Sequence, residues 1–249
     1  MLKLAVYGKG GIGKSTITTN LAVALAEAGC KVMQIGCDPK ADSTLALHQD
    51  HDLQPLLELI KDNSKKKLTD IVFQGEAGVY CVETGGPMPG LGCAGRGIGL
   101  VLEYLRQNKA IETLKIDAIL FDVLGDVVCG GFSMPMREGY AKHVLIATSG
   151  EKMSLHAAKN ISRAINNFQQ RGYAQLAGLI FQDHGDSDEP AAVQELASKL
   201  NSEILATLPY SLEIKQAEKI GRPLVLTHPD SSLSQTFRDL AQKLLQTLN

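Results

Sequence analysis

The chain has 249 residues, of which 44% are hydrophobic and 21% are charged, and its formal net charge is −2. This composition is typical of a globular protein with a sizeable core, and the charge gives no electrostatic reason to expect nucleic acid as a partner. No run approaches the ~20 apolar residues of a membrane span, and the first residues enter a strand pattern directly. We therefore expect a cytoplasmic protein with neither a nucleic-acid nor a membrane partner.

Short apolar runs alternate with helical patterns along the whole chain. Strands are predicted at residues 2–7, 31–37, 79–83, 116–123, 143–148, 176–182 and 203–208. Helices are predicted at residues 15–29, 97–108, 154–171, 189–200 and 232–248. Nearly continuous apolar strands are expected in a parallel sheet that is covered on both faces. The pattern predicts an α/β fold, with residues 1–249 forming a single domain around a doubly wound, mostly parallel sheet.

The stretch "GKGGIGKST" follows the first strand and opens the first helix. Its spacing is that of a phosphate-binding loop, in which glycines turn backbone N–H groups toward phosphates at a helix N-terminus. Lys14 is expected to reach the β and γ phosphates, and Ser15 to ligate Mg²⁺. The candidate nucleotide-binding residues are Gly8, Lys9, Gly10, Gly11, Ile12, Gly13, Lys14, Ser15 and Thr16.

Lys9 is an addition that an ordinary phosphate loop does not need. It marks the deviant Walker A type of P-loop NTPase, which is found in dimeric ATPases. In those families this lysine crosses to the nucleotide of the partner subunit, where its charge stabilises the transferring phosphoryl group. The motif therefore predicts a dimeric ATPase with Lys9 as a catalytic residue.

Acidic residues follow two strands at the edge where open α/β sheets bind ligands. Asp38, Lys40 and Asp42 lie in "CDPKADST", after the second strand, and are expected near the phosphates. "FDVLGD" places Asp122 in the Mg²⁺ shell, with Gly125 and Asp126 sensing the γ-phosphate. Asp38 and Asp126 are the candidate catalytic carboxylates. The alternative for each aspartate is a helix cap or a turn.

Five cysteines are scattered along the chain, which does not indicate a disulfide framework. Cys93 in "GLGCAGRG" and Cys129 in "DVVCGGF" are flanked by glycines, whose free N–H groups suit iron-bound thiolates. A 4Fe-4S cluster takes four thiolates, and a homodimer would supply them as two from each subunit. The other three cysteines are interpreted as structural: Cys30 and Cys81 as small buried hydrophobes, whereas for Cys37, which touches the nucleotide loop, this interpretation stays open.

Four stretches together resemble the nitrogenase iron protein and its relatives: "GKGGIGKST", "CDPKADST", "ETGGPMPGLGCAGRG" and "DVLGDVVCGGFSMPMRE". The resemblance runs to about residue 228. It implies a homodimer bridged by one 4Fe-4S cluster, with Cys93 and Cys129 as ligands, that binds ATP and Mg²⁺ in each subunit. Such a protein takes electrons from a ferredoxin or flavodoxin and passes them singly to a larger catalytic component as ATP is hydrolysed.

The resemblance carries three further implications. Arg96 matches an arginine that contacts the partner and can be ADP-ribosylated. The segment from Asp122 to Cys129 would act as a connecting rod from the γ-phosphate to a cluster ligand. The loop at residues 209–214, including Pro209, would cover one side of the adenine.

The chain also departs from typical nitrogenase iron proteins. Gln182, Asp183 and His184 stand where an Asn-containing sequence usually borders the adenine, and either Gln182 or Asp183 is expected to take that role. The longer C-terminal tail is absent. These departures favour a relative that serves another acceptor, such as a tetrapyrrole reductase or a methylthio-compound reductase, and "GCAGRG" disfavours the chlorophyll type.

The sequence leaves open two alternative functions outside this family. One is a positioning or partition ATPase without iron and sulfur, and the other is a small-molecule kinase or ligase. A positioning ATPase predicts a membrane-targeting C-terminal helix. The apolar stripe of residues 237, 240, 244 and 248 is instead interpreted as packing on the chain's own sheet.

Overall fold

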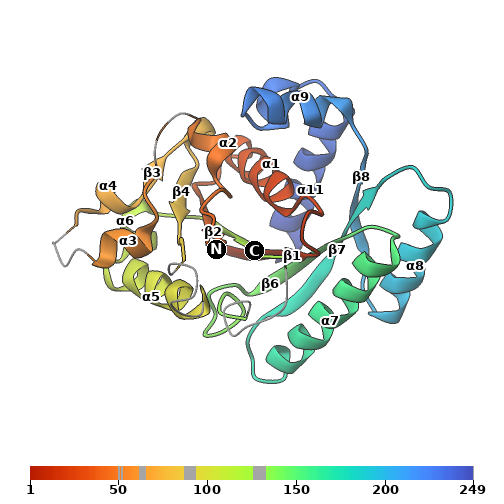
Figure 1. The fold of residues 1–249 in the computed structure, drawn as a ribbon, viewed down its shortest axis with the longest axis horizontal. Coiled ribbons are helices and arrows are strands. Elements are labelled where there is room, and N and C mark those ends of the chain that lie inside the picture. The colour runs from red at the N-terminus through yellow and green to blue at the C-terminus, as the bar shows by residue number, and fades with distance from the viewer. Residues whose placement is uncertain (50, 52, 62–65, 87–93, 126–132, 249) are drawn as a thin grey trace.

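The computed structural model describes residues 1–49, 51, 53–61, 66–86, 94–125 and 133–248. The predictions for Cys93, Asp126 and Cys129 fall outside the described residues. Within the described part the chain forms one eight-stranded sheet, in the order β3-β4-β2-β5-β1-β6-β7-β8. Every neighbouring pair is parallel except β3 and β4, which are antiparallel. The predicted doubly wound, mostly parallel sheet is confirmed (Figure 1).

The strands span β1 (Leu2–Gly8), β2 (Val32–Cys37), β3 (Phe73–Gln74), β4 (Tyr80–Glu83), β5 (Ala118–Val123), β6 (His143–Thr148), β7 (Gln175–Asp183) and β8 (Ile204–Pro209). All residues of β2, β5 and β6 are buried, because helices cover both faces of the sheet. In the described part of the chain, the carboxyl ends of the seven parallel strands lie at one edge, where the candidate site is predicted.

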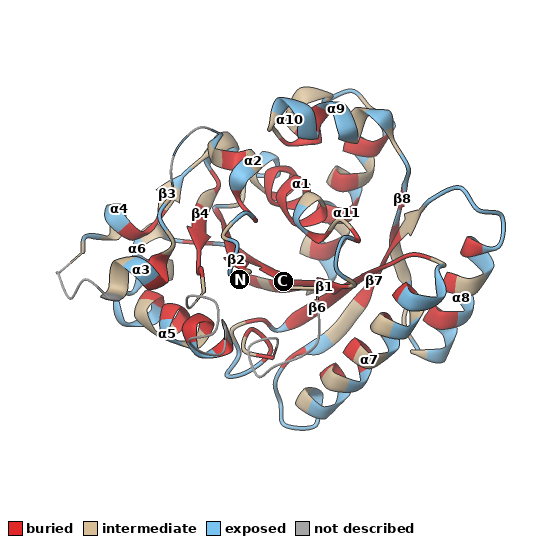
Figure 2. Ribbon diagram, in the orientation of Figure 1, coloured by how far each residue is buried: buried red, intermediate tan, exposed pale blue. Residues whose placement is uncertain are grey.

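The helices span α1 (Lys14–Glu27), α2 (Leu45–His48), α3 (Leu56–Lys61), α4 (Leu68–Ile71), α5 (Ala94–Gln107), α6 (Ala110–Leu114), α7 (Lys152–Gln169), α8 (Glu189–Lys199), α9 (Leu212–Ile220), α10 (Leu224–Thr227) and α11 (Ser232–Leu248), with a 3-10 turn η1 at Glu76–Gly78. Alternate residues of β1 face two separate cores. Leu4 and Val6 pack with α1 and α11, whereas Ala5 and Tyr7 pack with α5 and α7 on the opposite face. Helices α7 and α11 bury the stripe that faces the sheet, whereas residues 17–25 of α1 are all buried (Figure 2).

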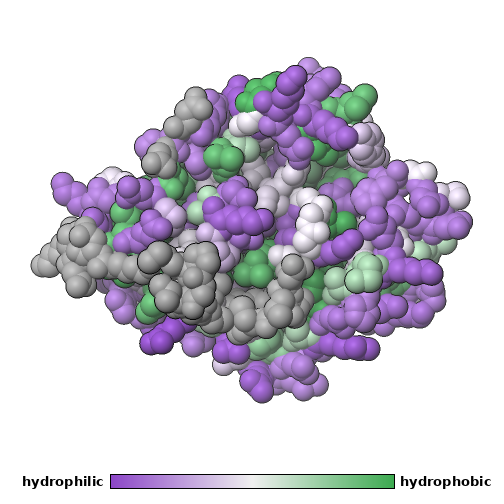
Figure 3. Space-filling model, in the orientation of Figure 1, coloured by the Kyte–Doolittle hydropathy of each residue, from purple (hydrophilic) through white to green (hydrophobic). Residues whose placement is uncertain are grey.

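The C-terminal stripe packs inside the molecule, as predicted. Phe237, Leu240 and Leu244 of α11 are buried in the core shared with α1. Arg238 adds an ion pair with Glu27 at the end of α1, with 2.7 Å between Nε and Oε2. None of the described helices is long and apolar enough to cross a membrane. On the face shown in Figure 3 the surface is mainly hydrophilic, with apolar side chains in separate small groups.

One predicted loop is partly helical. Residues 209–214 were expected to be a loop, but α9 begins at Leu212. Ser211 caps this helix, because its hydroxyl accepts a hydrogen bond from the Glu213 N–H at 3.1 Å. Helices α2, α3 and α4 and strand β3 were not predicted, because these elements are too short to show a clear apolar period.

Candidate functional site

The phosphate loop joins β1 to α1 and requires its glycines. Gly11 and Gly13 have φ angles of 77° and 91°, in the left-handed region that favours glycine. A Cβ at Gly8 would lie 2.4 Å from the Ala147 carbonyl oxygen. A Cβ at Gly11 would instead meet nothing within 4 Å, so the loop has open space near the start of α1 where a phosphate can approach the backbone.

Lys14 and Asp122 bring opposite charges to this loop. Lys14 is 8% exposed, and its Nζ donates to the Lys9 carbonyl at 3.1 Å. Burial raises the pKa of the Asp122 carboxyl, while hydrogen bonds from the Ser15 and Ser43 hydroxyls and the nearby Lys14 ammonium lower it. A carboxylate beside a serine hydroxyl at the end of a strand is a set of oxygen donors that Mg²⁺ prefers.

A cavity of about 230 Å³ brings the predicted polar residues together. Its lining consists of Gly10, Gly11, Lys14, Ser15, Asp38, Lys40, Asp42, Asp122, Val123, Leu124 and Gly125. Gly125 contacts the phosphate loop closely, since a Cβ there would lie 2.5 Å from the Gly10 Cα. Asp38 closes a turn by accepting a hydrogen bond from the Lys40 N–H at 2.9 Å. The Lys14 ammonium, the Ser15 hydroxyl and the glycine backbone of the loop fit a nucleotide polyphosphate with Mg²⁺.

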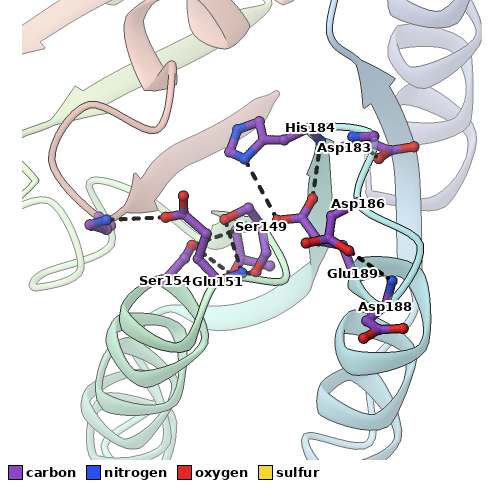
Figure 4. A network of polar contacts seen from close by, with 11 residues as sticks. Ser149, Glu151, Ser154, Asp183, His184, Asp186, Asp188 and Glu189 are labelled. Atoms are coloured by element: carbon purple, nitrogen blue, oxygen red, sulfur yellow. Dashed lines mark hydrogen bonds and ion pairs between the residues drawn. The ribbon is translucent and has the colours of Figure 1, made fainter.

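Lys9 does not share the burial of Lys14. It is an intermediate, 39% exposed side chain, and its Nζ lies 3.3 Å from the Glu151 Oε2 at the start of α7 (Figure 4). Exposed ion pairs of this kind contribute little, typically under about 1 kcal/mol. The Lys9 ammonium can therefore leave Glu151 at small cost.

The loop after β6 is packed against the start of α8. A Cβ at Gly150 would lie 2.4 Å from the Glu189 Cα, so the two segments touch through glycine. Glu189 is buried and accepts a hydrogen bond from the His184 N–H at 3.0 Å, with the His184 ring beside it (Figure 4). This network fixes the end of β7 relative to α7.

The candidate adenine contacts at the ends of β7 and β8 differ in their surroundings. A Cβ at Gly13 would lie 2.9 Å from the Gln182 Nε2, so the Gln182 side chain lies against the phosphate loop. Asp183 closes its own turn by accepting from the Gly185 N–H at 2.8 Å. Pro209 pairs with Asp183 as the last residue of β8. The adenine contact that the sequence left open between Gln182 and Asp183 remains a prediction.

Two features near the nucleotide loop were missed in the sequence. A second cavity of about 200 Å³ lies between α1, α9 and α10, and there the Thr16 hydroxyl donates to Glu218 at 3.1 Å. Glu83 is buried at the end of β4, and burial raises the pKa of its carboxyl to about 7. The signal for Glu83 in the sequence was its place as a charged residue at the end of an apolar strand.

The three cysteines that the structure describes differ in burial. Cys37 and Cys81 are buried, and burial is the main cause that raises the pKa of each thiol. Cys30 is partly buried. Among the described residues no group of three or more histidines, cysteines or carboxylates could hold a metal. The predicted cluster ligands Cys93 and Cys129 lie outside that part of the chain.

Solved structures share the fold at low sequence identity. The Pyrococcus furiosus cell division ATPase MinD superposes with a TM-score of 0.78 at 22% identity, covering 99% of both chains. A ParA family ATPase from Chlorobium tepidum gives a TM-score of 0.75 at 19% identity, covering 97% of this chain and 98% of that one. These likenesses confirm the predicted fold class and carry no more than the fold.

Curated relatives are much closer in sequence. A nitrogenase iron protein of Methanospirillum hungatei is 47% identical, over 98% of this chain and 88% of the relative. "Nitrogenase iron protein 2" of Methanothermococcus thermolithotrophicus is 42% identical, over 99% of this chain and 89% of the relative. The prediction of an enzyme of the nitrogenase iron protein class is confirmed at this level.

The model of one protein family matches residues 2–248, nearly the whole chain. Its description is "4Fe-4S iron sulfur cluster binding proteins, NifH/frxC family". Together with the relatives above, this match means that the chain belongs to the NifH/frxC family of 4Fe-4S cluster binding proteins.

Proposed function

We propose that this chain is the ATP-dependent reductase component of a nitrogenase or nitrogenase-like system, working in the cytoplasm as a homodimer with one bridging 4Fe-4S cluster. The observation that carries the proposal is a cavity lined by the phosphate loop, Asp38 and Asp122 in a chain of an iron–sulfur family. Leu124 and Gly125 in the wall of that cavity lead along the sequence to Cys129.

The residues of the proposed nucleotide site divide between phosphate binding, Mg²⁺ binding and hydrolysis. Lys14 binds the β and γ phosphates, and Ser15 with Asp122 holds Mg²⁺. Lys9 leaves Glu151 and reaches the nucleotide of the partner subunit as the two subunits close, where it offsets the charge of the transferring phosphoryl group. Asp38 and Asp126 orient the attacking water.

The proposed ligands of the 4Fe-4S cluster are Cys93 and Cys129 of both subunits. The cluster supplies one-electron redox chemistry at low potential. In this proposal loss of the γ-phosphate relaxes Gly125 and Asp126, and the segment that begins at Asp122 carries the change toward Cys129. A ferredoxin or flavodoxin is the proposed electron donor, and a larger catalytic component is the proposed acceptor.

The test is an anaerobic purification followed by visible spectroscopy and iron analysis. About four irons per dimer are expected, lost in both Cys93→Ala and Cys129→Ala. Cys30→Ala is the matched control, because that cysteine is partly buried and outside the proposed site, and it should keep full iron content. A colourless, iron-free wild-type protein that still hydrolyses ATP would overturn the proposal in favour of an iron-free positioning ATPase.

A further inference from the structure

Glu83 is a buried carboxylate that the proposed function leaves without a role. It is 1% exposed and ends β4. Its Oε1 accepts two hydrogen bonds of 2.6 Å from Thr44, one from the backbone N–H and one from the hydroxyl. Its Oε2 accepts no hydrogen bond from any residue in the described ranges. Two short bonds from one residue mean that Glu83 determines where Thr44 lies.

A glycine makes room for this carboxylate. Gly36 of β2 pairs with Glu83 on one side and with Asp122 on the other. A Cβ at Gly36 would lie 2.0 Å from the Glu83 Oε2 and 2.7 Å from the Ser43 Cβ. Glu83 therefore occupies the space above Gly36, in the same row of the sheet as the proposed Mg²⁺ carboxylate.

The segment between β2 and α2 is held at both of its ends by the residues around the end of β4. Thr44, near its C-terminal end, is bonded to Glu83. Pro39, near its start, touches Gly86, where a Cβ would lie 2.5 Å from the Pro39 Cβ. This segment contributes Asp38, Lys40 and Asp42 to the phosphate cavity. Gly86 precedes Cys93 by seven residues along the chain.

We propose that Glu83 is a positioning residue, which couples the nucleotide-facing segment of residues 38–44 to the chain that leads to Cys93. The inference rests on the proposed function and adds a second route to the cluster beside the one from Asp122 to Cys129. When Mg²⁺ and nucleotide move Asp38 and Asp42, the Thr44 bonds transmit the movement to the end of β4. Without those bonds the C-terminal end of the segment loses its link to β4, while the contact of Pro39 with Gly86 at the other end remains.

The test compares two variants that lose the same charge at nearly the same side-chain length. Glu83→Gln keeps an oxygen that accepts from Thr44, whereas Glu83→Met has no such acceptor. The measurement is the rate at which an iron chelator removes the cluster iron, with MgATP and without nucleotide, beside iron content and MgATP affinity. In Glu83→Met the change in rate caused by MgATP is expected to fall at least about fivefold, the lower range of coupling between sites. Glu83→Gln should retain most of the wild-type response.

The outcomes separate a positioning role from a merely structural one. Equal responses in Glu83→Met and wild type would overturn the inference and leave the proposed function standing, and so would an equal loss in both variants. Thr44→Val, which loses the hydroxyl bond and keeps the N–H bond, gives an intermediate response if the inference is right. It decides the question if Glu83→Met fails to assemble. Iron-free wild-type protein would instead count against the proposed function itself.

Discussion

At the scale of single residues, the two lysines of the phosphate loop have different surroundings and different expected roles. Lys14 is buried over its own cavity, whereas Lys9 lies half-exposed against Glu151. Lys14→Ala should weaken MgATP binding about ten- to a hundredfold, the value of one or two charge-assisted hydrogen bonds. Calorimetric titration of the purified dimer measures this affinity, and wild-type affinity in the variant would contradict the assignment of Lys14.

Lys9→Ala should leave MgATP affinity within about threefold of wild type while lowering the hydrolysis rate about a thousandfold, as for a lost arginine finger. The reason is that Lys9 contacts Glu151 rather than the cavity of its own subunit. Single-turnover hydrolysis, measured beside the same calorimetric titration, separates the two effects. If the variant loses affinity and rate together, Lys9 acts on its own nucleotide.

Glu83 should also leave a signature in the pH dependence of stability. Burial, opposed by the Thr44 hydrogen bonds and supported by Asp122 and Asp42, raises the pKa of Glu83 to about 7 in the folded protein. The folded state then binds the Glu83 proton more tightly than the unfolded chain does. The protonated carboxyl therefore contributes to the free energy of unfolding at low pH. That contribution is lost as the pH rises toward 7, by on the order of 3 kcal/mol.

Glu83→Gln has no titrating group at this position. As the pH rises from about 5 to 8, the melting temperature of wild type should therefore fall relative to that of the variant. Thermal melts of both proteins across this range check the prediction. Melting curves that keep a constant offset between the two proteins would show that Glu83 does not titrate there.

At the scale of elements, the site depends on the close approach of two loops from neighbouring strands. The loop after β5 meets the phosphate loop at Gly125, and a Cβ there would lie 2.6 Å from the Gly10 backbone nitrogen and 2.9 Å from the Lys14 Nζ. Because backbone atoms cannot yield as a flexible side chain does, Gly125→Ala must separate the loops. We expect MgATP affinity to fall at least about tenfold, with iron content unchanged.

Gly172→Ala is the control for this substitution. Unlike Gly125, Gly172 has a left-handed φ, 74°, but a Cβ there has nothing within 4 Å, and its turn follows α7 away from the cavity. It should cost about 1 kcal/mol of stability and leave MgATP affinity unchanged. Equal losses of affinity in both variants would mean that the effect of Gly125→Ala is a general loss of stability.

At the scale of the whole molecule, the proposed chemistry needs two copies of the chain. Lys9→Ala and Lys14→Ala subunits can be mixed before the cluster is assembled. In a mixed dimer, the intact Lys14 of one subunit and the intact Lys9 of the other form one complete nucleotide site. Mixing equal amounts should restore roughly a quarter of the wild-type ATPase rate, because half of the dimers then carry one working site of two. A mixture no more active than its parts would contradict action across the interface.

The contacts that tie the site together join residues far apart in the chain. Thr44 and Glu83 are 39 residues apart, Lys9 and Glu151 are 142 apart, and Thr16 and Glu218 are 202 apart. No local pattern indicates such pairs, because the order of the strands decides which segments meet. For the same reason the sequence could not show that the Gln182 side chain lies against Gly13 of the phosphate loop.

The sequence by itself determined the alternation of strands and helices, because apolar period and glycine turns are local properties. It also determined the phosphate loop, because the backbone groups and side chains that are expected to bind phosphate lie within nine consecutive residues. Only the tertiary structure decided the start of α9, the partner of Lys9 and the buried place of Glu83. Each of these follows from packing between elements, where the space left by one residue, such as Gly36, determines what its neighbour can do.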